Sequence, residues 1–318
     1  SSRGLQAKPG PTSIDPCTQL VAAQIGWSNW EEIVSSNTVG VFRPKDDKQL
    51  SDILRVAKKN QCTVRITGAT GSHDGLVMER REQKVVIVSL ADHRTQNRNW
   101  NTDKVYTSSN KVRIGAGRSF YDLTQLIRPK GYVLKSRMAG RYFTIGGVVA
   151  NMVHGAASSH GFIHEDVSAL LVMLANGNIQ EITAESELKY WRNSAGLLGV
   201  ILAVELNLLR DEVFEMILDV KTYDTTSLSF INSFVNDVFT AVASNDHTEF
   251  FFNPYDGQLL ILRSDMSATP PSPADLNNYQ RAANNLVSSM SANDISFRGA
   301  PKVPITSACD LIPQPYCL

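Results

Sequence analysis

The sequence has no excess of either charge, because its 318 residues contain 31 Lys and Arg against 31 Asp and Glu. Proteins that bind nucleic acid or acidic membrane surfaces usually carry a basic face, so this balance predicts neither partner. No apolar run approaches the roughly 18 residues that a membrane-spanning helix needs, so no membrane span is predicted. The length suits one large domain or two ordinary ones.

Cysteine is scarce, with only Cys17, Cys62, Cys309 and Cys317. No two of them form a C-x-x-C pair, which disfavours a zinc or thioredoxin-type site. Two disulfides and four free thiols remain equal alternatives. The first residue is Ser rather than Met and the cysteine number is even, so we expect a processed chain that is secreted. The absence of an Asn-x-Ser/Thr acceptor weakens the secreted alternative.

Both common nucleotide-binding motifs are missing. Residues 68–75 follow a predicted strand and carry glycines in the spacing G-x-x-G-x-x-x-G, whereas a Rossmann fingerprint needs G-x-G-x-x-G opening a helix. No Gly-Lys-Ser/Thr P-loop occurs. The backbone N–H groups of such a glycine-rich loop can still form a nest for phosphate oxygens. We therefore expect that any nucleotide is bound in a non-Rossmann manner.

A second glycine-rich segment, TIGGVVANMVHGAASSHG, covers residues 144–161 and has almost no charge. Small residues let a backbone come close to a flat ligand or a diphosphate. The alternative is a tight crossing inside the core, and taken alone the segment favours neither interpretation. The first glycine-rich loop shifts the balance towards a ligand site.

The remaining patterns predict an α+β chain in three parts. Residues 1–37 are interpreted as an N-terminal arm with a short helix over 17–34, and residues 38–210 as the first domain. Residues 211–318 are predicted to form a second unit in the order β-α-β-β-α, with its last helix over 274–290. This order is typical of a ferredoxin-like unit that lacks its final strand.

Four blocks of the first domain resemble the flavin domain of the vanillyl-alcohol-oxidase and p-cresol-methylhydroxylase (PCMH-type) superfamily. They are VFRPKDDKQLSDILRVAKKNQCTVRITGATGSHDG, VRIGAGRSFYDLTQLIRPKGYVL, FTIGGVVANMVHGAASSHGFIHEDVSALLVMLANGNIQEI and GLLGVILAVEL. The third block is most similar to the branch that oxidises sugar lactones and alditols. That branch also has organellar members, so the resemblance implies an organellar chain as the alternative to a secreted one. HTEFFFNPYDGQLLILRSD resembles a strand pair in that branch's cap domain. The resemblance implies a two-subdomain, FAD-binding PCMH-type domain followed by a partial ferredoxin-like cap.

The resemblance also implies which residues contact FAD. Backbone amides of the first loop would hold the diphosphate: Gly68, Ala69, Thr70, Gly71 and Ser72. The ribityl chain and ring would be lined by Gly146, Gly147, Asn151, Gly155, Ala156 and Ser158, with His154 as a structural position in the same block. Val200 and Ile201 would contact the adenine side or the ring edge.

Whether the flavin is covalently attached depends on how the first loop is aligned. Many relatives link FAD through a His in the pattern G-x-G-H-S. The ungapped alignment places Gly71 at that His and Ser72 at the Ser, which implies a non-covalent flavin and is the favoured alternative. Shifted by two residues, His73-Asp74 resembles the G-G-H-D version of the berberine-bridge branch, and His73 becomes the attachment residue.

The implied activity is FAD-dependent oxidation of a CH–OH group on a small molecule, namely a sugar, sugar lactone or polyol. In this family the acid–base residues usually come from the later cap and a C-terminal return to the flavin domain, which this sequence does not contain. We therefore name no catalytic base and expect a further segment or second polypeptide. The alternative is a catalytically inactive flavin-fold subunit or scaffold. No metal site is predicted from His154, His160 and His164, because the segment lacks helical spacing.

Overall fold

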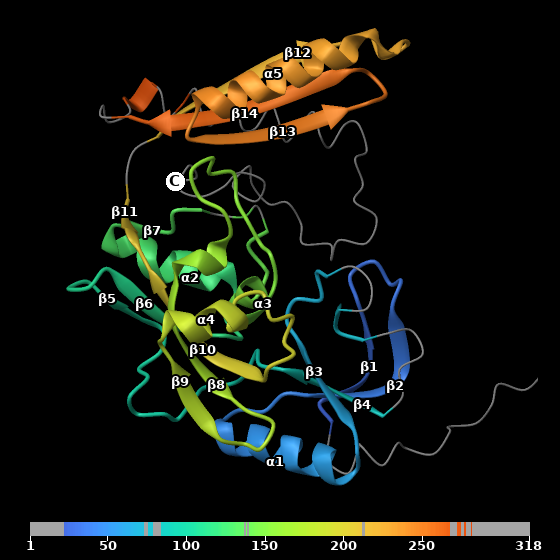
Figure 1. The fold of residues 1–318 in the computed structure, drawn as a ribbon, viewed down its shortest axis with the longest axis vertical. Helices are drawn as coiled ribbons and strands as arrows, with labels where there is room; N and C mark the ends of the chain where they lie inside the picture. Colours follow the sequence, from blue (N-terminus) through green and yellow to red (C-terminus); the bar gives the residue numbers. More distant parts are fainter. Residues whose placement is uncertain are drawn as a thin grey trace, which may run out of the picture.

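The computed structural model describes residues 22–72, 76–78, 84–136, 138, 140–211, 214–267, 272–274, 277 and 281. The first unit, residues 22–211, contains two sheets side by side, and the second unit, residues 214–267, lies at one end of it (Figure 1). Within the described residues, no helix is both long enough and apolar enough to cross a membrane.

The first sheet has the strand order β1-β2-β4-β3, with β2, β4 and β3 parallel. Its strands are β1 (Gln24–Ser28), β2 (Ser35–Phe42), β3 (Thr63–Thr67) and β4 (Val85–Ser89). Strand β4 is buried along its whole length, as its run of β-branched residues predicts for a central parallel strand. Helix α1 (Asp47–Lys59) connects β2 to β3.

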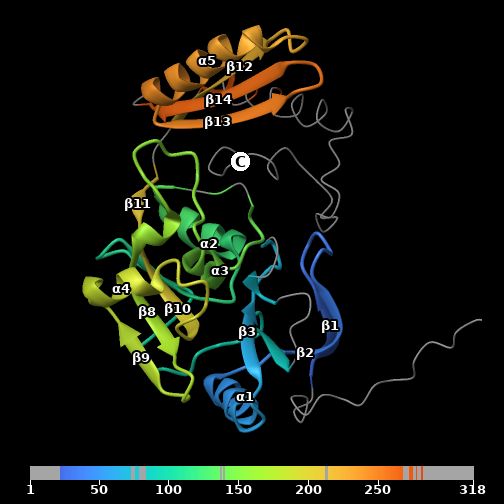
Figure 2. The same cartoon turned by 45° about the vertical axis from the view of Figure 1, so that its right-hand side comes forward.

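The N-cap of α1 is Asp46, whose side chain accepts a hydrogen bond from the Gln49 N–H at 2.8 Å. The helix packs its apolar face, including Leu50 and Ile53, into a core shared by both sheets. Figures 1 and 2 show α1 at the opposite end of the first unit from the second unit.

The second sheet is antiparallel, in the order β5-β6-β10-β8-β9. Its strands are β5 (Lys104–Tyr106), β6 (Lys111–Gly115), β8 (Val167–Met173), β9 (Ile179–Ile182) and β10 (Val200–Asn207). The helices between them are α2 (Phe120–Ile127), α3 (Ile145–Ala150) and α4 (Glu185–Trp191), with 3₁₀ turns η3 (Arg128–Lys130) and η4 (Ile163–Asp166). A short pair, β7 (Tyr132–Val133) with β11 (Leu209–Arg210), follows the sheet towards the second unit.

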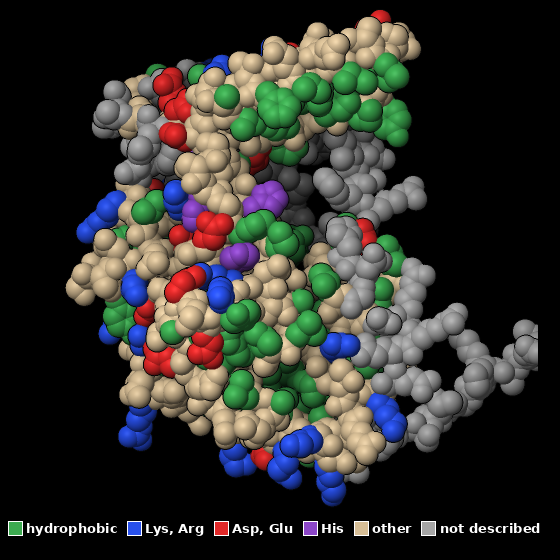
Figure 3. Space-filling model, viewed as in Figure 1, with side chains coloured by type: hydrophobic (Ala, Val, Ile, Leu, Met, Phe, Trp, Pro, Cys, Tyr) green, Lys and Arg blue, Asp and Glu red, His purple; other side chains and the backbone are tan. Residues whose placement is uncertain are grey.

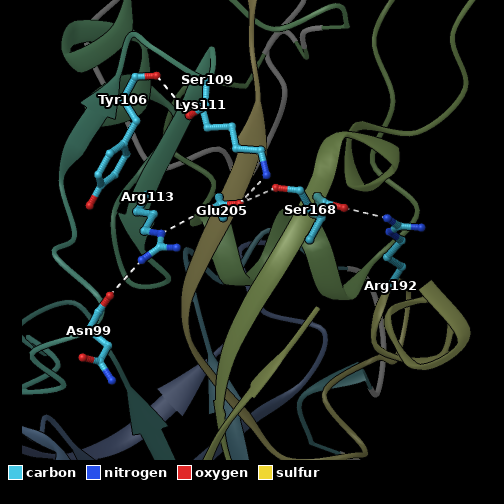
Figure 4. A network of polar contacts seen from close by, with 9 residues as sticks. Asn99, Tyr106, Ser109, Lys111, Arg113, Ser168, Arg192 and Glu205 are labelled. Atoms are coloured by element: carbon cyan, nitrogen blue, oxygen red, sulfur yellow. Dashed lines mark hydrogen bonds and ion pairs between the residues drawn. The ribbon is translucent and has the colours of Figure 1, made fainter. Parts of the chain in front are cut away.

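A polar network joins three strands of this sheet around Glu205 on β10 (Figure 4). One carboxylate oxygen accepts hydrogen bonds from Lys111 Nζ at 2.7 Å and Ser168 Oγ at 2.8 Å, and the other accepts one from Arg113 Nε at 2.7 Å. Arg113 continues to the Asn99 carbonyl at 2.8 Å. Because every donor comes from a neighbouring strand or loop, Glu205 links β6, β10 and β8 independently of their backbone ladder.

The second unit is an antiparallel sheet covered on one face by a helix. It comprises β12 (Phe214–Thr222), η5 (Leu228–Phe230), α5 (Ile231–Ser244), β13 (His247–Asn253) and β14 (Gln258–Met266), in the strand order β12-β14-β13. This order fits the β-α-β-β part of the predicted ferredoxin-like unit. Most of the predicted last helix, 274–290, lies outside the described residues, and the role of this unit as a cap stays a prediction.

Aromatic side chains hold α5 on its sheet. The Phe250-Phe251-Phe252 run alternates as a strand should, so that Phe250 and Phe252 pack in the core while Phe251 is exposed on the other face. Phe234 of α5 meets Phe252 edge-on with ring centroids 4.9 Å apart. Two of the three rings therefore belong to the core of the second unit.

The predicted N-terminal helix is wrong in its described part, because residues 24–28 form strand β1. Strand β1 pairs with β2, and the register shifts between Ile25 and Trp27, where Gly26 has a φ of +98°. This bulge lets Trp27 point into the core on the outer face of the first sheet. Pairing with β2 thus outweighs the local helical pattern of the sequence.

The cysteine alternatives are resolved for one residue. Cys62, just before β3, is disulfide-bonded, so the alternative of four free thiols is wrong. Cys17, Cys309 and Cys317 lie outside the described residues.

Candidate functional site

A cavity of about 250 Å³ lies where the two sheets of the first unit meet. Its wall combines segments that are remote in sequence: parts of residues 66–72, 76–77, 90–91, 116–117, 143–153 and 195–201. These are the ends of β3, β4 and β6, the helix α3 and the start of β10. Both glycine-rich segments of the sequence therefore contribute to one cavity, as expected.

The first glycine-rich loop presents unused backbone donors to this cavity. Thr70 has a left-handed φ of +58°. The carbonyl groups of Thr70 and Ser72 are turned away, accepting from Trp30 N–H at 3.1 Å and Asn29 Nδ2 at 3.4 Å. Within the described part of the chain, none of the N–H groups of residues 69–72 donates a hydrogen bond. Successive free N–H groups in a loop with a left-handed residue can form an anion-binding nest.

The second glycine-rich segment supplies a wall without large side chains. Helix α3 is fixed by backbone bonds of 2.8 Å from Ile145 N–H to the Arg118 carbonyl and from Gly146 N–H to the Ala116 carbonyl. Asn151 follows α3, and its Nδ2 donates to the Gly147 carbonyl at 2.8 Å. These contacts hold the helix against the end of β6 while its glycines face the cavity.

Close backbone contacts explain why side chains are missing elsewhere in the wall. A Cβ added at Gly117 would overlap the Leu90 carbonyl, so this glycine lets the ends of β6 and β4 touch. Gly196 lines the cavity with a φ of +74°, and a Cβ there would meet no atom within 4 Å. At Gly196 the left-handed backbone, rather than a close contact, therefore accounts for the missing side chain.

The described part of the cavity wall is uncharged. Among the described residues that line it there is no Asp, Glu, Lys, Arg or His. Apolar side chains such as Ile66, Val148 and Ile201 make most of its surface. An uncharged slot with an N–H nest at one side suits a ligand that combines a flat ring with a phosphate group. This is the chemistry of a flavin dinucleotide.

Comparison with protein families agrees with this geometry. Residues 39–183 match the family described as "FAD binding domain". These residues form an FAD-binding domain of the PCMH type. The cofactor of the domain is FAD, and the residues present fit it: the free N–H groups of the first loop suit the diphosphate, and the uncharged wall suits the ring.

Curated relatives of the FAD-binding domain are oxidases at low identity. The chain is 22% identical over 259 residues to L-gulonolactone oxidase of Bos taurus, covering 78% of this chain and 53% of that protein. It is 23% identical over 189 residues to D-arabinono-1,4-lactone oxidase of Candida glabrata, covering 57% and 34%. It is 24% identical over 183 residues to alditol oxidase of a Streptomyces species, covering 57% and 41%. The chain thus spans about half or less of the length of these relatives.

Solved structures share the fold. Cholesterol oxidase from B. sterolicum superposes with a TM-score of 0.66 at 16% identity, over 90% of this chain and 59% of that one. A solvent-stable cholesterol oxidase gives 0.67 at 14% identity, over 85% and 56%. At these identities the likeness concerns the fold alone.

Nine of the residues predicted to contact FAD line the cavity. They are Gly68, Ala69, Thr70, Gly71, Ser72, Gly146, Gly147, Asn151 and Ile201. Val200 is buried beside Ile201 but does not line it. His73, the alternative attachment residue, lies outside the described residues.

The other four predicted residues, His154, Gly155, Ala156 and Ser158, lie outside the cavity wall. Ala156 accepts a hydrogen bond from Thr248 N–H at 3.0 Å, and Ser158 N–H donates to the Asp246 carbonyl at 2.7 Å. The structure thus divides the second glycine-rich segment: its first half lines the cavity, and its second half pairs with the start of β13 in the second unit. We name residues 156–158 and 245–248 the junction.

Histidines gather beside the junction, as the purple side chains between the two units show (Figure 3). The side chain of His160 is 8% exposed, and its Nε2 lies 3.4 Å from Asp166 Oδ2. Burial raises the pKa of the Asp166 carboxyl despite the nearby His160 and Lys135. Burial also lowers the pKa of His164, which stacks on Phe162 at 5.2 Å. Within the described residues, no group of three or more His, Cys, Asp or Glu is arranged to hold a metal ion.

Sequence reasoning did not assign several wall residues. Phe143 and Thr144 immediately precede the glycines of α3, and Gly117 and Gly199 belong to the short patterns GAG and GLLG. A glycine directly after or before a buried strand was the available signal for the latter two, because it marks a close backbone approach. No sequence signal distinguishes Phe143 from an ordinary core residue.

Proposed function

We propose that the protein is an FAD-dependent oxidoreductase that oxidises a CH–OH group of a sugar, sugar lactone or polyol. The observation that carries this proposal is that both glycine-rich segments build one cavity within an FAD-binding domain, and that its described wall is uncharged. The oxidase names of the three relatives support the reaction class and suggest the substrates.

The chain's own residues would bind and orient the cofactor. FAD, when bound, supplies the hydride acceptor, so the protein has to supply position and environment. The free N–H groups of residues 69–72 would neutralise diphosphate oxygens. The apolar wall, with Val148 and Ile201, would exclude water from the ring. The described wall holds no ionisable group, so we place the acid–base residue outside it.

The second unit would close over the substrate. The junction attaches β13 to the segment that also forms the cavity wall, which places the two units side by side. We propose that this unit, completed by a further segment or a second polypeptide, carries the substrate-binding residues. The catalytically inactive alternative has no support in the relatives, each of which is named as an oxidase.

The experiment is an anaerobic reduction assay. The purified protein, together with any chain that copurifies, would be loaded with FAD and mixed with L-gulono-1,4-lactone, D-arabinono-1,4-lactone and xylitol in turn. We expect at least one substrate to bleach the visible absorption band of the bound flavin, and oxygen or an added electron acceptor to restore it. Free FAD with the same substrates is the control.

Two results would argue against the proposal. A protein that binds no FAD would contradict the assignment of the cavity, and a flavin-loaded protein that no member of the panel reduces would contradict the substrate class.

A further inference from the structure

The ring of Phe143 fills a specific gap in the cavity wall. A Cβ added at Gly71 would overlap the ring edge at Cε1, and one added at Gly140 would overlap the opposite edge at Cε2. The ring therefore lies between two bare stretches of backbone, one from the first glycine-rich loop and one from the segment before α3. No side chain at position 71 fits while Phe143 is in place.

The neighbouring contact has the same character. A Cβ at Gly68 would overlap Thr144 Oγ1, so the residue after Phe143 also packs directly on the first loop. Residues 143 and 144 thus press on both ends of the loop that carries the free N–H groups. The position of the nest relative to α3 depends on these two side chains.

The described wall also contains no nucleophile suited to attachment. A covalent bond to a cofactor needs a reactive side chain such as His, Cys, Lys or Tyr beside it. The described residues that line the cavity include none of these four types. The described wall instead provides aromatic and aliphatic side chains and backbone N–H donors.

We propose that Phe143 is a positioning residue for FAD: its ring takes the space of a side chain at position 71, fixes the first loop against α3, and leaves the flavin bound by non-covalent contacts alone. This inference rests on FAD being the cofactor. It goes further by assigning the mode of attachment and the residue that enforces it.

The first test asks whether flavin is released on denaturation. Holoprotein would be precipitated with acid, and flavin would be measured in the supernatant and, by in-gel fluorescence, on the chain. We expect all flavin in the supernatant. Flavin that stays on the chain overturns the proposal, and its loss in a His73→Ala variant would then assign the bond to that residue. A protein that never takes up FAD overturns the cofactor assignment itself, which is a distinguishable result.

The second test is a mutant cycle on the contact between Gly71 and Phe143. Dissociation constants for FAD would be measured by quenching of its fluorescence for Gly71→Ala, Phe143→Leu and the double variant. We expect Gly71→Ala to weaken binding about tenfold or more, and the double variant to recover about tenfold, since residues in contact are coupled to that extent.

Gly115→Ala is the matched control. Gly115 lies at the end of β6 outside the cavity wall, and its added Cβ would make only ordinary contacts, at 3.7 and 3.9 Å. Circular dichroism would confirm that each variant is folded before binding is compared. Independent effects of the two substitutions, or unchanged binding in Gly71→Ala, would overturn the proposed role of Phe143. If Gly71→Ala does not fold, recovery of folding and FAD binding in the double variant supports the contact, and failure to recover overturns it.

Discussion

The carboxylate of Glu205 is largely shielded from water and accepts hydrogen bonds from three side chains. Burial alone would raise its pKa, but hydrogen bonds from Lys111, Arg113 and Ser168 outweigh burial and hold the pKa of this carboxyl below its usual value. A carboxyl whose pKa is lower in the folded state stabilises the fold at pH values above its unfolded pKa. That contribution is lost as the pH falls through the folded pKa.

We therefore predict that Glu205→Gln destabilises the protein at neutral pH by about 1–3 kcal/mol, the usual effect of losing hydrogen bonds to a charged group. The difference from the unmodified protein should shrink as the pH falls below the unfolded value near 4.5. Urea unfolding at several pH values measures the loss of stability and its dependence on pH. Asp52→Asn, in an exposed ion pair with Lys48, should leave stability unchanged and serves as the control. A pH-independent difference for Glu205→Gln would contradict the pKa argument.

For single residues, the sequence predicts where the backbone is closely approached better than it predicts which side chains touch each other. Glycines in the loop at residues 68–72 and at Gly146 and Gly147 were identifiable, because missing side chains report a close approach whatever the rest of the fold. Phe143 and Glu205 were not, since their roles come from residues far away in sequence. The residues next to a Phe or Glu in the sequence do not indicate which distant residues it contacts.

Helix α5 shows how one element divides its apolar residues between core and solvent. Phe234 packs among Tyr223, Phe230 and Phe252, with ring centroids 4.9–6.2 Å away. Phe239, five residues later, is 69% exposed on the outer side. Figure 3 shows hydrophobic side chains at the surface of the second unit, where the exposed residues of α5 include Ile231, Val235, Phe239 and Val242.

We predict that Phe234→Ala destabilises the second unit by about 2–4 kcal/mol, because it removes a ring from an aromatic cluster. Phe239→Ala should change stability by less than about 0.5 kcal/mol, since the ring is exposed and Ala favours the helix. The unfolding temperatures of the two variants, monitored by circular dichroism, measure this difference. Both substitutions remove the same ring, so only its position differs. Equal effects would show that α5 does not pack as described.

Elements with a strong local pattern could be predicted, and elements made by pairing could not. The cap at Asp46 and the Asn-Gly turn between β8 and β9 mark their elements within a few residues. Strand β1 exists because β2 pairs with it, and its bulge at Gly26 breaks the alternation that would have revealed it. The six-residue helix α3 is too short and too rich in glycine to show a helical period.

At the scale of the whole molecule, FAD should stabilise the two units unequally. The cavity lies within the first unit, while the second unit touches it through the junction. We predict that FAD at a hundredfold excess over its dissociation constant raises the unfolding temperature of the first unit by roughly 5–10 °C, as mass action implies for a domain of this size. Protection of backbone amides in hydrogen exchange should rise in residues 63–72 and 143–153 and remain unchanged in β12 and β14.

NAD⁺ is the control for this prediction, because it shares the diphosphate and adenosine but has no flavin ring. We expect it to raise the unfolding temperature far less. An equal rise with both dinucleotides would mean that the ring contributes nothing to binding, contrary to the uncharged wall described for the cavity.

The overall organisation was partly accessible from sequence. Four blocks in order along the chain predicted the PCMH-type domain and FAD, and the family match confirms both. The division of residues 144–161 between cavity and junction was not predictable. It depends on where β13 lies in space, and β13 comes almost ninety residues later in the chain.

The scattered origin of the cavity wall sets the order of events during synthesis. The wall is complete only when residues 195–201 have joined the loop at 66–72, so β10 has to leave the ribosome before a full site exists. Nascent chains that end earlier leave β8 without β10, the strand that separates it from β6 in the second sheet. A complete binding site for the dinucleotide therefore forms only after residues 66–201 have all been synthesised.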